Sequence, residues 1–103
     1  MIKGPKKAKA LAAPPASQAA PVTYQVAIAL RALRDGTANE GQQKMALEWI
    51  VGDAAGKRYF PYHDNERDTS FALGRLFVAE QITGLFYLDI KALRDKDERT
   101  IQA

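Results

Sequence analysis

Residues 68–82 read DTSFALGRLFVAEQI. Apolar side chains recur in this segment at steps of three and four residues, which is the period of a helix with a broad apolar face. Asn65 and Asp68 are both good N-cap residues, so we expect the helix to start at one of them and to run to about Thr83. A helix that is apolar over most of its surface belongs at the centre of a packed fold. The segment therefore predicts an all-α domain with this helix as its central element.

Gly74 and Arg75 lie at the middle of the predicted helix. A glycine inside a helix costs about 1 kcal/mol relative to alanine, and the close approach of another backbone would offset that cost. We therefore predict a partner interface at this point. The alternative is that Gly74 packs helices within one chain and that Arg75 pairs with a local acid such as Glu48 or Asp68. The predicted interface comprises Phe71, Gly74, Arg75 and Val78.

Two shorter helices are predicted before this segment. Thr23 is suited to cap the first helix, and Gly36 is suited to end it. Thr37 and Glu40 have the spacing of a capping box, which predicts the start of the second helix. We expect Trp49 to anchor the core from a buried stripe of this second helix. The predicted stripe comprises Met45, Ala46, Trp49 and Ile50.

The rest of the chain predicts a connection and a last helix. Pro61 favours an extended path for residues 57–65, whose aromatic side chains we expect to fold back over the helices. Gly84 predicts a break, after which residues 85–99 continue as a helix. Its inward-facing side chains are expected to be Leu85, Leu88 and Leu93. No strand is predicted, so the expected fold class is all-α, a small bundle of three to four helices.

The charge of the chain is unevenly distributed. The net charge is +3, yet residues 1–21 carry four lysines and no acid, whereas residues 22–103 hold 11 basic and 12 acidic side chains. The Ala- and Pro-rich composition of residues 1–21 buries too little surface to offset the entropy of ordering. We therefore predict a flexible, disordered basic N-terminal arm over residues 1–21 and a helical domain over residues 22–103. The basic residues of the arm are Lys3, Lys6, Lys7 and Lys9.

The arm has two interpretations. Four lysines can contact DNA without sequence preference, or an acidic protein surface, by releasing counterions. The alternative is a leader that only improves solubility.

Composition excludes several classes of site. The chain has 103 residues and no cysteine, which allows one small domain and excludes disulfides and thiolate metal sites. His63 is the single histidine, so no set of imidazoles is available for a zinc or haem centre. No apolar run reaches the 18 residues of a membrane span. We therefore expect no cofactor and no membrane partner.

An enzyme is the least supported class. His63 stands beside Asp64, Glu66 and Asp68, an arrangement that would suit a divalent cation or an acid–base pair. No nucleophile motif, glycine-rich phosphate loop or second histidine accompanies this cluster. The acids also favour the positive end of the helix that follows them. We interpret the cluster as a helix start and expect no enzyme.

DNA regulation is the alternative function. The two short helices and their tight turn resemble a helix-turn-helix, with Gln42, Gln43 and Lys44 near the start of its second helix, where side chains meet base edges. The domain without its arm is slightly acidic, which disfavours DNA as its main partner.

A pattern of single residues at helical spacings runs from Met45 to about Leu85, with Trp49 in its first helix. This pattern resembles a family of small tailed-phage proteins first defined in a Bordetella podophage. The resemblance implies a helical phage product from head and portal gene clusters, and it transfers no catalytic residue. Residues 1–21 lie outside the pattern. Its later members are Asp68, Thr69, Phe71, Gly74, Arg75, Val78 and Ile82.

The leading hypothesis combines this resemblance with composition. A domain of about 80 residues with one Trp, four Phe and four Tyr has more apolar surface than short helices can hide, which favours self-association or a partner groove. We therefore expect a non-enzymatic phage virion-associated or assembly protein. Its expected partners are phage structural proteins (portal, capsid or tail) or a second copy, and its expected location is the virion or the host cytoplasm.

Overall fold

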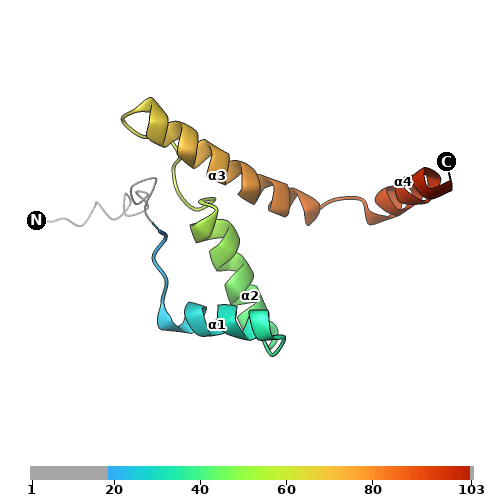
Figure 1. Ribbon diagram of the computed structural model, residues 1–103, viewed down its shortest axis with the longest axis horizontal. Coiled ribbons are helices and arrows are strands. Elements are labelled where there is room, and N and C mark those ends of the chain that lie inside the picture. Colours follow the sequence, from blue (N-terminus) through green and yellow to red (C-terminus); the bar gives the residue numbers. More distant parts are fainter. Residues whose placement is uncertain (1–18, 103) are drawn as a thin grey trace, which may run out of the picture.

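The computed structural model describes residues 19–102, and side chains up to residue 99 (Figure 1). All regular structure in this part of the chain is helical, with no strand, so the fold is all-α as predicted. The lysines of the predicted arm lie outside the described residues. The elements are α1 (Tyr24–Asp35), α2 (Glu40–Trp49), the π-helix η2 (Ile50–Ala54), α3 (Glu66–Leu85) and α4 (Ile90–Gln102).

Both predicted ends of α1 are confirmed. The Val26 N–H donates to the Thr23 hydroxyl at 3.2 Å, which satisfies one of the free donors of the first turn. Gly36 ends the helix at φ 75°, in the left-handed region that suits glycine, and its N–H bonds back to the carbonyls of Ala32 and Leu33.

The predicted start of α2 is wrong by two residues. Asn39 is the N-cap, because its Oδ1 accepts from the Gln42 N–H at 2.8 Å and Gln42 Oε1 accepts from the Asn39 N–H at 3.0 Å. The box predicted for Thr37 and Glu40 does not form. Thr37 is instead used to close α1, where its N–H donates to the Ala32 carbonyl at 2.9 Å.

α2 continues without a break into η2, whose turns are one residue wider than those of an α-helix. The carbonyl of Ile50 accepts from the Ala55 N–H at 2.8 Å. The next two carbonyls accept from the chain that leaves the helix, Val51 from Lys57 at 3.1 Å. The backbone that follows the wide turn therefore satisfies the carbonyls of its first three residues.

The core is built from small side chains. α1 packs against α2, and η2 packs against α3. Trp49 is only partly buried and does not anchor the core as predicted. Its indole N–H donates to the Pro21 carbonyl at 2.8 Å, so Trp49 ties the segment before α1 to α2. Met45, predicted to be buried, is exposed. The buried side chains are Ala29, Ala46, Val51, Ala55, Ala72 and Ala79.

α3 starts where the sequence predicted, after the N-cap Asn65, whose Oδ1 accepts from the Asp68 N–H at 2.8 Å. It is not the central helix, because among the described elements only η2 packs against it. Gly84 lies inside α3 and the break falls at residues 86–89. α4 then starts at Ile90, bent by 94° from α3.

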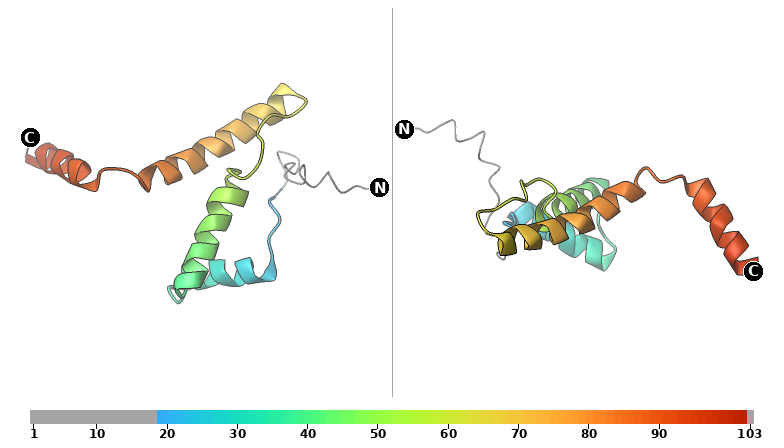
Figure 2. Two further views of the ribbon diagram at one scale, coloured as in Figure 1. Left: turned by 180° about the vertical axis from the view of Figure 1, so that it is seen from behind. Right: turned by 90° about the horizontal axis from the view of Figure 1, so that it is seen from above.

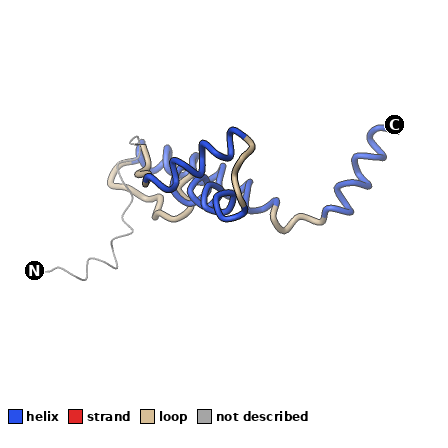
Figure 3. The backbone as a smooth tube through the Cα atoms, turned by 90° about the horizontal axis from the view of Figure 1, so that it is seen from below, coloured by secondary structure: helices blue, strands red, loops and turns tan. Residues whose placement is uncertain are grey.

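α4 lies against none of the other described helices. Leu85, Leu88 and Leu93, predicted to face inward, are therefore all exposed. Figure 2 shows α4 extending away from the other helices, and Figure 3 shows the loop that carries it. The radius of gyration is 17.9 Å, against about 13 Å for a compact domain of 100 residues. The molecule measures 65 × 36 × 22 Å and leaves much apolar surface in water.

Candidate functional site

α3 has a covered side and an open side. On the covered side Ala79 is buried against Val51 and Ala55 of η2, with Leu76 and Ile82 packed around them. The open side carries a straight row of exposed residues at alternating steps of four and three, which we call the outer seam. Among the described elements only η2 packs against α3, and it does so on the covered side. Figures 1 and 2 show how α3 lies among the other helices. It comprises Arg67, Phe71, Gly74, Val78, Gln81 and Leu85.

Three of the four predicted interface residues, Phe71, Gly74 and Val78, lie together on the outer seam. Gly74 has no neighbour within 4 Å of the point where a Cβ would stand. The alternative in which Gly74 packs helices within one chain is therefore not seen. The prediction missed Gln81 of the seam, although its spacing from Val78 and Leu85 is visible in the sequence.

Arg75 lies apart from the outer seam and is partly buried. A Cβ at Gly56 would stand 2.9 Å from its Nε, so the guanidinium fits only because residue 56 is glycine. Its Cζ lies 5.8 Å from the centre of the Phe71 ring, within reach of a cation–π contact. Among the described residues Arg75 forms no ion pair, so the predicted pairing with Glu48 or Asp68 is absent. Arg75 therefore supports the covered side of α3.

A cluster around Asp53 fixes η2 in place. Its carboxylate accepts from Arg58 through two bonds of 3.2 Å and from the Tyr59 hydroxyl at 2.7 Å. Burial, and then the hydrogen bond to Asp53, raise the pKa of Tyr59 above its ordinary value of 10.0. Lys57 adds an ion pair of 2.8 Å to Glu80 of α3. The bonds to Asp53 hold the loop after η2 against η2, and the Lys57–Glu80 pair ties that loop to α3.

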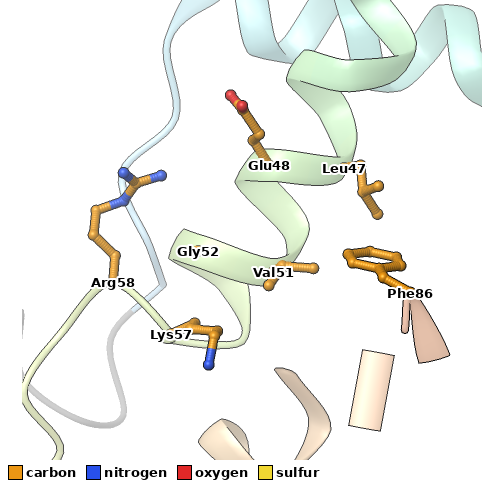
Figure 4. Close-up of a pocket in the computed structure, with 7 residues that line it drawn as sticks. All are labelled: Leu47, Glu48, Val51, Gly52, Lys57, Arg58 and Phe86. Carbon is orange, nitrogen blue, oxygen red and sulfur yellow. The ribbon is translucent and has the colours of Figure 1, made fainter. Parts of the chain in front are cut away.

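A groove of about 430 Å³ opens between α2, η2 and the turn after α3. Figure 4 shows the side chains of Leu47, Val51 and Phe86 turned toward one another at its apolar end. The two cations on its lining, Lys57 and Arg58, are already paired with acids. The groove is therefore suited to an apolar side chain. Its lining comprises Leu47, Glu48, Val51, Gly52, Lys57, Arg58 and Phe86.

The predicted base-reading residues all bond within their own turn. Gln42 completes the cap of α2, and the Gln43 side chain donates to the Ala38 carbonyl at 3.0 Å. Lys44 pairs with Glu40 at 3.1 Å. A groove-reading role would require these side chains to leave such contacts.

Of the predicted acidic cluster at the start of α3, Asp68 takes part in the helix cap formed by Asn65. Asp68 accepts from the Asn65 side chain at 3.1 Å, and the His63 N–H donates to the Thr69 hydroxyl at 2.8 Å. The described residues contain no group of three or more side chains placed to hold a metal ion.

Comparisons with protein-family models, curated proteins and solved structures find no match for this chain. The resemblance to the tailed-phage family therefore stays a prediction. Within residues 19–102 no single helix is long and apolar enough to cross a membrane, although α3 and the start of α4, taken together across their bend, meet the criteria of length and composition.

Proposed function

We propose that this protein is a non-enzymatic virion-associated or assembly protein of a tailed phage, which acts by docking its helical domain on phage structural proteins or on a second copy of itself. The observation that supports docking most strongly is the outer seam of α3, whose apolar side chains Phe71, Val78 and Leu85 are all exposed. The resemblance of residues 45–85 to the tailed-phage family supplies the phage context.

The exposed surface on α3 and on the turn after it is large for a free monomer. Phe77, Leu85, Phe86, Tyr87 and Ile90 are all more than half exposed. Monomers rarely expose apolar patches of more than a few hundred Å², and larger patches mark interaction sites. Full burial of one such side chain stabilises a complex by about 1.5–3 kcal/mol. A partner that covers this surface therefore has ample driving force.

The groove beside Phe86 supplies a second docking point. Its volume of about 430 Å³ and its apolar end suit one large apolar side chain of a portal, capsid or tail protein. Because Lys57 and Arg58 are paired with acids of the same chain, an anionic ligand would gain little there.

The basic arm adds a contact of a different kind. We propose that its lysines bind packaged DNA, or an acidic protein surface, without sequence preference. The support is the placement of the whole positive excess in residues 1–21. A helix-turn-helix regulator stays the alternative, with less support, because Gln42, Gln43 and Lys44 are engaged in local bonds.

Quantitative mass spectrometry of density-purified virions tests the proposal. We expect this protein at a fixed copy number relative to portal and capsid, which serve as internal standards. Procapsids purified from infected cells form the second sample, because an assembly factor can leave before the virion matures. Absence from both particles would contradict the proposal and favour the regulator.

A further inference from the structure

The outer seam of α3 has the spacing of a helix–helix contact. From Arg67 to Leu85 its members follow one another at steps of 4, 3, 4, 3 and 4 residues. Such alternation keeps a row of side chains facing one neighbouring helix over many turns. The two faces of α3 therefore have the same period, and only one of them is covered within the described chain.

The seam is uncharged over most of its length. Between Asp68 and Asp89 the only charged residues are Arg75 and Glu80. Arg75 lies against Gly56, with its guanidinium 5.8 Å from the Phe71 ring, and Glu80 pairs with Lys57, so neither is a member of the seam. Arg67, at the N-terminal end, is the one cation among the seam members, so nucleic acid or an acidic protein would find no row of cations there. The surface that matches an uncharged apolar row is another row of the same kind.

We propose that the outer seam binds the outer seam of a second copy, with the two α3 helices antiparallel, so that the protein is a homodimer. A two-fold arrangement requires a surface that is complementary to itself, and the stretch of the seam from Phe71 to Leu85, which carries no charge, meets that requirement. The inference deepens the proposed function by naming the occupant of the α3 surface. The groove beside Phe86 and the basic arm remain available to other partners.

One register pairs the whole helix. If positions are matched about residue 76, Gly74 lies opposite Val78 of the second copy and Phe71 lies opposite Gln81 of the second copy. The midpoint of Glu66–Leu85 lies within one residue of that centre, so the two helices overlap along their full length of about 30 Å. Gly74 then stands near the crossing point, where a missing side chain lets two backbones approach. The register supplies the neighbour that Gly74 lacks among residues 19–102 of its own chain.

The exposed apolar area agrees with a weak, concentration-dependent interface. With about 200 Å² for a large side chain, the seam residues Phe71, Val78 and Leu85 and the flanking Phe77 expose on the order of 400 Å² in each copy. A standard interface buries about 800 Å² on each partner, and weaker complexes bury less. The fractions are 51% for Phe71, 62% for Phe77, 48% for Val78 and 62% for Leu85.

The first test measures the mass of the full chain by sedimentation velocity from about 1 to about 100 µM, because dimer stability depends on protomer concentration. We expect a dimer in this range. Val78→Glu places a charge at the centre of the seam and should raise Kd at least about 100-fold. Leu73→Glu is the matched control, an exposed leucine of the same helix outside the seam, and should leave Kd within about threefold. Circular dichroism confirms that both variants keep their helices.

The second test measures the register by disulfide formation. The chain has no cysteine, so Arg67→Cys and Leu85→Cys each introduce one thiol. These positions are 18 residues, about 27 Å, apart along α3, far beyond the Cα separation of about 4.4–6.8 Å that a disulfide allows. In the proposed register the mixture of the two variants forms a covalent dimer under mild oxidation, and neither variant does so alone.

Several results would overturn the inference. A monomer at every concentration would do so, whether or not it binds phospholipid vesicles or a phage protein. A dimer that Val78→Glu leaves intact, or single-cysteine variants that link to themselves, would also do so. The proposed function can fail independently of the dimer. A dimer that depends on the seam but is absent from virions and procapsids would support the dimer and contradict the proposed function. A monomer found in virions would support the proposed function and contradict the dimer.

Discussion

Gly56 and Gly74 differ in whether the described fold requires a glycine at their position. Gly56 has φ 79°, which strains residues with a side chain, and its missing Cβ leaves room for Arg75. Gly74 has a helical backbone and open space around it, so nothing in the described part of the chain requires glycine there. The same residue type is therefore structural at one position and free for an external role at the other.

Replacement of each glycine by alanine, one at a time, should change the free energy of unfolding in opposite directions. Gly56→Ala should lower the free energy of unfolding by about 1–2 kcal/mol, because the left-handed backbone is strained and Arg75 must move. Gly74→Ala should raise it by up to about 1 kcal/mol when measured on the monomer, because alanine favours the helix. Urea denaturation of dilute protein measures both. A neutral Gly56→Ala would mean that Arg75 does not occupy this space.

Tyr59 should make stability depend on alkaline pH. Its pKa is raised above 10.0 in the folded state by burial and by the hydrogen bond to Asp53, so the folded chain holds the proton more tightly than the unfolded chain. The resulting stability is fully present below pH 10 and is lost as the pH rises through the folded pKa. Tyr59→Phe should remove this loss, and should cost about 1 kcal/mol at neutral pH through the missing bond to a carboxylate.

Absorbance of tyrosinate during an alkaline titration measures the same effect directly. The folded protein should contain one tyrosine that ionises after the others, and Tyr59→Phe should abolish this late step. If Tyr62→Phe abolished the late step instead, the late ionisation would belong to Tyr62, which would contradict the prediction.

At the scale of the element, local rules located helices better than they placed their faces. Thr23, Gly36 and Asn65 act as the sequence predicted because a cap involves only neighbouring residues. Two overlapping capping boxes were possible at the start of α2, and the choice depended on which residues closed α1. The π-helix was not predicted, because its wide turn is fixed by the returning Lys57 and Arg58.

The true cap of α2 can be checked by a pair of substitutions. Asn39→Ala should lower the free energy of unfolding by about 1 kcal/mol, because the Gln42 N–H loses its acceptor. Thr37→Ala should cost less, since its hydroxyl makes only a long bond of 3.4 Å to the Ala32 carbonyl. Chemical denaturation measures both variants. The reverse order of the two effects would restore the box predicted from Thr37 and Glu40.

At the scale of the whole molecule, the chain has many apolar residues and a core made mostly of alanine. Sequence placed Phe71, Gly74 and Val78 in an interface, and all three are exposed on one row. It could not separate Arg75 from them, because an almost wholly apolar helix does not indicate which side its neighbour covers. That choice is made by η2 and the cluster around Asp53.

The arm should dominate any DNA binding. With four lysines in contact with phosphates, the logarithm of affinity should fall with the logarithm of salt concentration at a slope of up to about −3.6. Deletion of residues 1–21 should abolish the binding, and substitution of the four lysines by glutamine is the matched control for arm length. Fluorescence anisotropy of labelled duplexes measures the slope. Sequence-specific binding that survives the deletion would instead identify the helix-turn-helix regulator.

The bond from Trp49 to Pro21 also gives the molecule a built-in optical reporter. Trp49 is the only tryptophan, and its indole N–H donates to the last residue of the predicted arm. Indole emission responds to the polarity and hydrogen bonding of its surroundings. A partner that draws the arm away from α2 should therefore change the emission wavelength or intensity of Trp49. Engagement of the arm can thus be followed in the unlabelled, unmodified chain, during assembly and in real time.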